Sequence, residues 1–198
     1  MSRIRRYRPR DRDALAAVCL RTADAGRDAT GLLEDDDVWA HVFVLPYLER
    51  HPEWAYVVEA DDERVVGYLV AAPDTAAFEE WFRAQWWPRF AERWPEPAAV
   101  RTRQDGVLRY AYDRGPGVEP FGAEHPAHLH IDLLPETQGQ GWGRRLIDRL
   151  IVDLRAAGVR GLHLVASADN TGALAFYERL GFARRASPDG VQAFTREL

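Results

Sequence analysis

The sequence predicts a single α/β domain spanning residues 1–198, and three observations lead to that fold class. Two alternating apolar segments, 54–59 and 64–71, are separated by a short polar stretch, which indicates an antiparallel hairpin. An apolar extended segment followed by a helical one then occurs twice, at 129–157 and at 162–180. The 198 residues, of which 46% are hydrophobic and 29% charged, are enough for one domain with its own core.

The elements before the hairpin follow in chain order. They are a first strand, a helix with Asp11 or Asp13 as its N-cap, an acidic turn-rich connection and a segment with helical spacing, at residues 3–8, 11–23, 24–36 and 37–50. A strand at 191–196 is expected to end the domain.

Residues 74–127 form an aromatic- and proline-rich insertion between the hairpin and the next strand. Aromatic residues recur at helical spacing over 78–90, and Pro88 is expected to kink or break that helix. Residues 107–112 are predicted to form a further strand, and 115–117 a mobile loop. An extra helix packed on the domain is favoured by four tryptophans, Trp81, Trp86, Trp87 and Trp94.

A glycine-rich turn between an extended segment and a helix is the most informative stretch of the chain. Glycines lack Cβ, so the main chain can adopt positive φ and approach a ligand closely. A strand, turn and helix in this order present backbone amides and a helix N-terminus to a phosphate, and two arginines add positive charge. We predict a pyrophosphate site; an ordinary strand–helix turn is the alternative. The residues are Gln138, Gly139, Gln140, Gly141, Trp142, Gly143, Arg144 and Arg145.

Two better-known phosphate motifs are excluded. The nucleotide P-loop needs a lysine, and all 26 Lys or Arg residues of this chain are arginine. The dinucleotide fingerprint needs G-x-G-x-x-G, whereas the spacing at Gly139, Gly141 and Gly143 is different.

A second motif follows the strand at 162–166. Asn170 or Asp169 suits the N-cap of a helix that ends before Gly181, and Tyr177 lies seven residues after Asn170. With Gln138, Gly141 and Gly143, these residues make the chain similar to the GNAT superfamily of acyl-CoA-dependent N-acyltransferases, whose motif is Arg or Gln, two residues, Gly, one residue, Gly or Ala. The resemblance covers about residues 128–183. It implies a GNAT fold with a central mixed, mostly antiparallel sheet, splayed fourth and fifth strands and helices on both faces.

The resemblance also implies acetyl-CoA as co-substrate, without a metal. It assigns coenzyme binding to the turn residues 138–145, to the amides of Leu133 and Leu134, and to Asn170, Phe176 and Tyr177. Tyr177 is in addition expected to protonate the leaving thiolate, because a phenol of ordinary pKa carries its proton at neutral pH.

The general base is not settled by the resemblance, because Val165 stands where many relatives have a glutamate. Instead His128, His130 and Asp132 alternate with apolar residues, so all three face the same side of their strand. We rank them Asp132, His130, then His128 as candidate bases. A hydrogen-bonded polar ladder and a metal site on the same three residues are the alternatives.

The insertion sets the chain apart from a typical GNAT protein, which passes from its third to its fourth strand by a short turn. It resembles, more weakly, the C-terminal acetyltransferase-like domain of O-GlcNAcase, on the residues Pro73-Asp74-Thr75, Trp87-Pro88 and 126–130. A wall over the acceptor site is the functional interpretation of this insertion. The expected activity is direct transfer of acetyl from acetyl-CoA to a primary amine of an unidentified small molecule or peptide in a ternary complex. A non-catalytic acetyl-CoA sensor and a partner-binding module are the alternatives.

Composition narrows the remaining classes of function. The net charge of −5 gives no basic surface for nucleic acid, and no apolar run has membrane-spanning length. The single cysteine, Cys19, excludes an internal disulfide and is expected to be buried. A cytoplasmic bacterial protein is expected, and the sequence is compatible with a homodimer.

Overall fold

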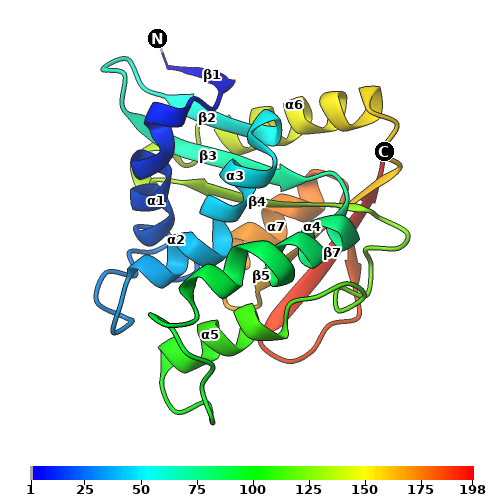
Figure 1. The fold of residues 1–198 in the computed structure, drawn as a ribbon. Coiled ribbons are helices and arrows are strands. Elements are labelled where there is room, and N and C mark those ends of the chain that lie inside the picture. Colours follow the sequence, from blue (N-terminus) through cyan, green and yellow to red (C-terminus); the bar gives the residue numbers. More distant parts are fainter. Residues whose placement is uncertain (1) are drawn as a thin grey trace.

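The computed structural model describes residues 2–198 and is built on one seven-stranded sheet with the order β1-β2-β3-β4-β5-β7-β6 (Figure 1). Every neighbouring pair is antiparallel except β4 and β5, which are parallel. The predicted mixed, mostly antiparallel sheet is therefore confirmed. The strands are β1 (Arg3–Arg6), β2 (Ala55–Glu59), β3 (Val65–Ala72), β4 (Ala127–Leu133), β5 (Gly161–Ser167), β6 (Ala183–Arg185) and β7 (Val191–Glu197).

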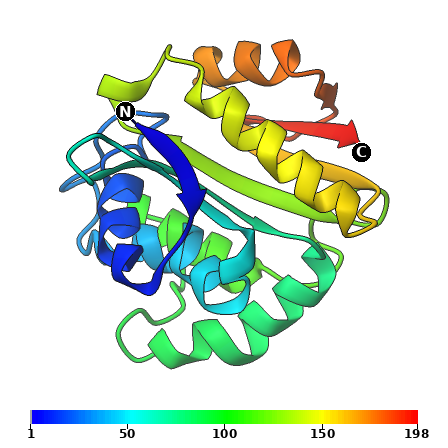
Figure 2. The ribbon, with the colours of Figure 1, turned by 90° about the horizontal axis from the view of Figure 1, so that it is seen from above.

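Helices cover both faces of this sheet. Figure 2 shows α6 (Trp142–Ala156) and α7 (Thr171–Arg179) on one face and the earlier helices on the other. The long helix α6 turns an apolar stripe toward the sheet, since its buried residues recur every three or four positions. The helices of the opposite face are α1 (Arg12–Leu20), α2 (Asp37–Phe43), α3 (Leu45–Arg50), α4 (Thr75–Trp81) and α5 (Arg103–Asp113).

Strands β4 and β5 pair over a short distance. The parallel register joins Ala127 to Leu162 and His128 to His163. Strand β4 continues to Leu133 along β3, while β5 continues to Ser167 along β7. The two strands therefore diverge, as the predicted splay requires, and the main-chain edges that face each other beyond this pairing do not bond to one another.

The segment 37–50 was predicted as one helical stretch and forms two helices. Pro46 has no amide proton to donate to the carbonyl of Val42, four residues earlier, and its ring clashes with that carbonyl in a continuous helix. The break falls at Val44, between α2 and α3, and leaves the carbonyl of Val42 without its helical donor. A side chain of the insertion, Arg114, donates to that carbonyl instead.

The insertion contains the predicted aromatic helix and its predicted break. Helix α4 ends at Trp81, a wider turn spans Phe82–Trp86, and a tighter turn spans Trp87–Phe90 around Pro88. The rings of Trp86 and Trp94 are fully buried, and their indole N–H groups donate to the carbonyl of His41 and to the Asp35 carboxylate, both at 2.9 Å. These rings anchor the insertion to the segment around α2.

The predicted strand at 107–112 is wrong, because these residues lie in helix α5. Thr102 caps the helix by accepting from the amide of Asp105 at 3.1 Å, and the Asp105 carboxylate accepts from the amide of Thr102 at 2.8 Å. Leu108 and Ala111, one turn apart, are the buried residues of its inner face. Strand β6 was not predicted; it is three residues long with an exposed pattern.

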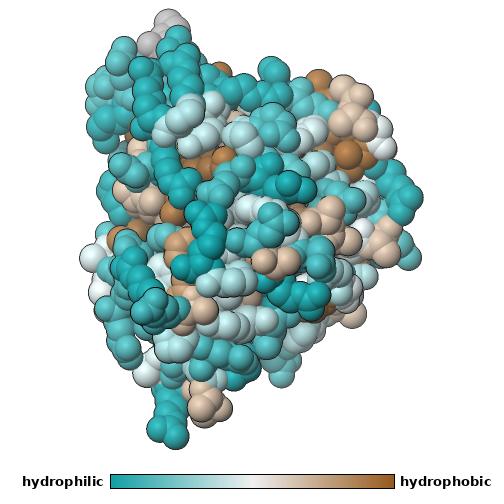
Figure 3. All heavy atoms as spheres, in the orientation of Figure 1, coloured by the Kyte–Doolittle hydropathy of each residue, from teal (hydrophilic) through white to brown (hydrophobic). Residues whose placement is uncertain are grey.

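No helix within residues 2–198 combines the length and the apolar character needed to cross a bilayer. The face in Figure 3 is largely hydrophilic, with small scattered apolar groups.

Candidate active site

The glycine-rich turn forms an open cradle of backbone amides. Gly139 and Gly141 have φ of +72° and +79°, and Gly141 is the N-cap of α6. Within residues 2–198, no group accepts a hydrogen bond from the amides of residues 139–144. A Cβ built at either glycine would meet nothing within 4 Å, so the space beside the turn is free. Several unpaired amides at a helix N-terminus are the arrangement that binds a phosphate group.

Gly143 has a different role from the two glycines before it. A Cβ at this position would lie 2.9 Å from Cζ of Phe176 and 3.6 Å from Cδ1 of Leu133. The missing side chain therefore lets the first turn of α6 approach α7 and β4 closely. Phe176, predicted as a coenzyme residue, lies at this junction.

The side chains of the turn hold its shape. The Gln138 amide donates to the carbonyl of Leu133 at 3.0 Å, and the Gln140 amide donates to the carbonyl of Glu136 at 2.8 Å. The guanidinium of Arg145 lies 4.6 Å from the ring centre of Trp142, and that of Arg144 reaches the carbonyl of Arg179 at 3.5 Å. With these side chains engaged locally, the amides are the groups that the turn offers to a ligand.

The two main-chain amides predicted to bind the coenzyme, those of Leu133 and Leu134, differ in whether they are free to donate a hydrogen bond. The amide of Leu134 donates to the carbonyl of Val66 at 3.0 Å, so it belongs to the sheet and has no free proton. This corrects the prediction for Leu134. Because successive amides of a strand point to opposite edges, those of Leu133 and Ile131 point away from β3, toward the gap beside β5.

Helix α7 presents the second predicted motif. The Asn170 side chain accepts from the amide of Ala173 at 3.0 Å and caps the helix, as expected. Two turns later Tyr177 lines the gap between the splayed strands. Burial, and next the charge of Asp132, raise the pKa of Tyr177, so its hydroxyl carries a proton at neutral pH.

The gap between β4 and β5 contains a cleft with two lobes. One lobe, which we call the insertion lobe, has a volume of about 430 Å³ and is lined by Tyr47 and by the insertion residues Glu79, Tyr110, Arg114 and Glu119. The other, the helix lobe, has a volume of about 280 Å³ and is lined by Asp132, Asn170, Ala173 and Tyr177. Both lobes share Phe43, Leu129, His130 and residues 164–167 of β5.

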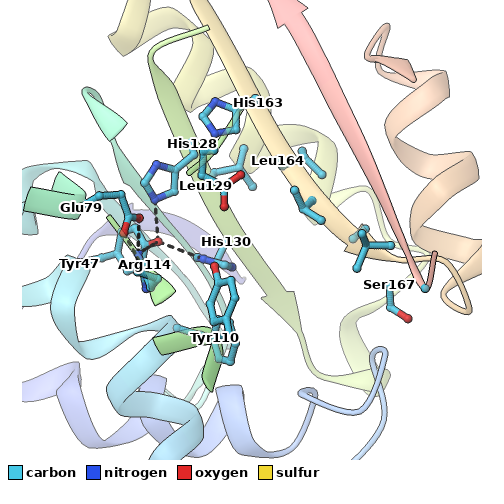
Figure 4. Close-up of a pocket in the computed structure, with 16 residues that line it drawn as sticks. Tyr47, Glu79, Tyr110, Arg114, His128, Leu129, His130, His163, Leu164 and Ser167 are labelled. Carbon is cyan, nitrogen blue, oxygen red and sulfur yellow. Dashed lines mark hydrogen bonds and ion pairs between the residues drawn. The ribbon is translucent and has the colours of Figure 1, made fainter. Parts of the chain in front are cut away.

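A chain of hydrogen bonds fixes the two histidines of β4 in the insertion lobe (Figure 4). The Thr75 hydroxyl lies 2.7 Å from the carbonyl of Pro126, which can only accept, so the hydroxyl proton is used there. Nδ1 of His128, 2.8 Å from Thr75 Oγ1, is therefore the protonated nitrogen, and its Nε2 accepts from the Tyr47 hydroxyl at 2.7 Å. Nε2 of His130 then donates to the Tyr47 oxygen at 3.1 Å. His130 Nδ1 is left with a lone pair, and His130 lines both lobes.

Burial favours the neutral form of both imidazoles. Burial, and next the positive charge of Arg114, lower the pKa of His130 to about 3. Burial lowers the pKa of His128 well below its usual range, and the charges of His163 and His130 add to this. Both nitrogens of His128 are engaged, so of the two residues His130 alone has a lone pair to offer.

Asp132 lies in the helix lobe, where the Tyr68 hydroxyl of β3 donates to its carboxylate. Burial raises the pKa of Asp132, and the bond from Tyr68 partly opposes this. The three polar residues of β4 share one face of the strand, as predicted, but the two histidines bond to Tyr47 whereas Asp132 bonds to Tyr68. In the described part of the chain, no group of three or more His, Cys, Asp or Glu side chains is arranged to hold a metal ion.

A buried ion pair, missed by the sequence analysis, closes the insertion lobe. Arg114 donates to both carboxylate oxygens of Glu79, at 2.9 and 2.7 Å, and the two side chains are 4% and 5% exposed. Its Nη1 donates at 3.0 Å to the carbonyl of Val42, the one left free by Pro46. The pair thus ties α4 and the end of α5 to the break between α2 and α3. No local spacing signals it, because its members lie 35 residues apart.

Comparisons with known proteins agree with this geometry. The family model described as "Acetyltransferase (GNAT) family" matches residues 25–182. A mycothiol acetyltransferase of Geodermatophilus obscurus is 37% identical over 102 residues, which make up 50% of this chain and 33% of that protein. Protein O-GlcNAcase of Rattus norvegicus is 23% identical over 192 residues, 94% of this chain and 20% of that protein. The chain thus spans a third or less of the length of these two relatives.

A solved structure matches the whole fold. The crystal structure of SsHAT superimposes with a TM-score of 0.94 at 39% sequence identity, covering 99% of this chain and 98% of that one. Both resemblances expected from the sequence, to GNAT proteins and to O-GlcNAcase, are confirmed. With a glycine turn that opens a helix, a splayed pair of strands and a family match over most of its length, the chain belongs to the acetyltransferase (GNAT) family.

Proposed function

We propose that this protein is an N-acetyltransferase that moves the acetyl group of acetyl-CoA directly to a primary amine. The observation that carries the proposal is the row of unpaired amides at residues 139–144, which lies beside the gap between β4 and β5. In this assignment the amides and the N-terminus of α6 hold the pyrophosphate of the co-substrate. The pantetheine arm lies in the gap, where the amides of Ile131 and Leu133 are free to donate. Asn170 and Phe176 shape the same passage.

The chemistry is assigned to the residues where the two lobes meet. The amine lies in the insertion lobe, and Nδ1 of His130 takes the proton of its nitrogen as the C–N bond forms. The imidazole passes this proton on to water in the lobe, because a pKa of about 3 does not let it keep the proton. The C–S bond of the thioester breaks, and Tyr177 in the helix lobe donates a proton to the leaving sulfur. His130 replaces Asp132 as our preferred base, because its Nδ1 has no hydrogen-bond partner and the residue lines both lobes. His128, engaged at both nitrogens, positions Tyr47 and through it His130.

The printed names of the relatives support an acetyl transfer. Several curated relatives are mycothiol acetyltransferases, and one of them, from Pseudarthrobacter chlorophenolicus, is 34% identical over 76% of this chain. Since this chain covers 40% of that protein, the acceptor of the longer relative is not assigned to it.

Binding of acetyl-CoA by isothermal titration calorimetry tests the coenzyme site. Gly141→Glu puts a negative side chain next to the free amides and should weaken binding at least tenfold. Gly158→Glu is the matched control, since Gly158 also has a positive φ (+74°) with nothing within 4 Å of its Cβ, but lies at the far end of α6. The proposal fails if the wild type shows no saturable binding, or if both variants bind equally.

Transfer is tested by thiol release with a panel of primary amines. The expected result is release that depends on the amine and saturates with it. Saturable acetyl-CoA binding with no amine-dependent release would instead support the non-catalytic acetyl-CoA-binding alternative.

A further inference from the structure

The insertion lobe contains more negative than positive charge. Two carboxylates, Glu79 and Glu119, and one guanidinium, Arg114, line it. Arg114 and Glu79 neutralise each other through two hydrogen bonds. Within residues 2–198, the carboxylate of Glu119 has neither an ion pair nor a hydrogen bond, so one negative charge in this lobe is left over when Glu119 is ionised.

Glu119 stands where an unpaired carboxylate is costly. It is half-buried in the segment that follows α5. Burial raises its pKa, and the like charge of Glu79 adds to this more than Arg114 opposes it. A buried carboxylate is stabilised by a cation that hydrogen bonds to it. No basic side chain of the described residues fills this role.

The walls of the lobe suit an apolar chain that carries such a cation. The rings of Phe43 and Tyr110 stack at 5.6 Å with an interplanar angle of 18°, and Phe43 meets the edge of His130 at 5.5 Å. Phe43 thus contacts both His130 of β4 and the insertion residue Tyr110. Aromatic faces of this kind favour a methylene chain or a cation over an anion.

The free lone pairs of the lobe point to the same class of ligand. Nδ1 of His130 has no partner, as shown above. The lone pair of His130 and the unpaired carboxylate of Glu119 both accept hydrogen bonds, so together they suit a ligand with several N–H donors.

We propose that the acceptor is a dication: a primary amine joined by an apolar chain to a second cationic group, with Glu119 holding that second group. This inference rests on the proposed function, because it places the reacting nitrogen at His130. A monoamine with an apolar far end would leave Glu119 unpaired, and an ω-amino acid would put a carboxylate against it. The lobe therefore selects its acceptor by the charge that the acceptor carries at its far end, opposite the reacting amine.

Turnover is compared for three acceptors of similar length: 1,5-diaminopentane, pentylamine and 5-aminopentanoate. A charge-assisted contact at Glu119 should make kcat/KM of the diamine about 10–100-fold higher than that of pentylamine, with the amino acid lowest. Glu119→Gln should narrow the ratio of diamine to pentylamine to about threefold or less. Glu124→Gln, an exposed change in the same segment, is the matched control and should keep the wild-type ratio. Equal use of diamine and pentylamine by the wild type would overturn the proposal.

Equilibrium binding separates this proposal from the transfer reaction itself. Titration of 1,5-diaminopentane into the protein alone should show binding that weakens about tenfold or more in Glu119→Gln and is unchanged in Glu124→Gln. This result supports the dication site even if no amine is acetylated. No binding by the wild type, or equal binding by the wild type and Glu119→Gln, would overturn the site whatever the turnover.

Discussion

Replacing Glu79 by glutamine tests whether the buried ion pair holds the insertion on the domain. The change keeps the shape of the side chain but removes the charge that faces Arg114. The other partners of the guanidinium are neutral, the carbonyl of Val42 at 3.0 Å and the hydroxyl of Tyr47 at 3.5 Å. Arg114 would therefore remain as a buried cation, 4% exposed, without a bonded counterion.

The expected loss of stability follows from this burial. Removing one partner of a buried pair typically costs about 3–5 kcal/mol. We expect the lower end, about 3 kcal/mol, because Glu119 also interacts electrostatically with Arg114 and partly compensates. For a domain of this size, each kcal/mol lowers Tm by about 2–4 °C, so Tm should fall by about 6–12 °C.

Urea unfolding followed by tryptophan fluorescence measures the free energy of unfolding directly. The matched control is Glu80→Gln, the next residue of α4, whose pair with Arg83 at 3.2 Å is exposed (58% and 60%). Such a surface pair contributes less than about 1 kcal/mol. Replacing both members by Glu79→Gln and Arg114→Met should recover part of the loss, because no uncompensated charge remains. Equal losses for Glu79→Gln and Glu80→Gln would refute the reasoning.

Three further predictions concern the cleft and the junction of α6 with α7. Tyr177→Phe should lower kcat about 100-fold with acetyl-CoA affinity changed less than about twofold, measured by thiol release and calorimetry; unchanged turnover would exclude the phenol as the acid. Because the folded-state pKa of His130 (about 3) is below its unfolded value, stability is lost as pH falls from about 6.5 toward 3. His130→Gln should make that loss shallower by up to about 1.4 kcal/mol per pH unit in urea titrations, and an identical slope would contradict the assignment. Gly143→Val should cost about 1–3 kcal/mol by pressing on Phe176, and Phe176→Leu in that background should recover part of it.

Features fixed by neighbouring residues could be predicted from the sequence. The hairpin of β2 and β3, the cap at Asn170 and the positive φ of Gly139 and Gly141 depend on a few adjacent residues each. The break near Pro88 is of the same kind, since a proline acts on its own turn. In each case the local chemistry allows few alternatives.

Features that depend on packing between distant segments could not be predicted. The alternation of Val107 to Tyr112 looked like a strand, and the capping box of Thr102 and Asp105 was the local signal that would have corrected it. Our preference for His130 over Asp132 as the proposed base depends on Tyr47 and Tyr68, which lie on other elements. No spacing within β4 distinguishes the two.

The short parallel pairing of β4 with β5 has a mechanical consequence. Strands β1 to β4 and strands β5 to β7 form two half-sheets, and two residue pairs at one end join their main chains. The two half-sheets are thus connected along only part of their common edge. A slender ligand that lies between β4 and β5 can bond to both strands where they do not bond to each other, so it should make the sheet more rigid. Amide hydrogen exchange along the unpaired edges of β4 and β5 should slow when such a ligand is bound. Exchange at the end where the two strands already pair should not change.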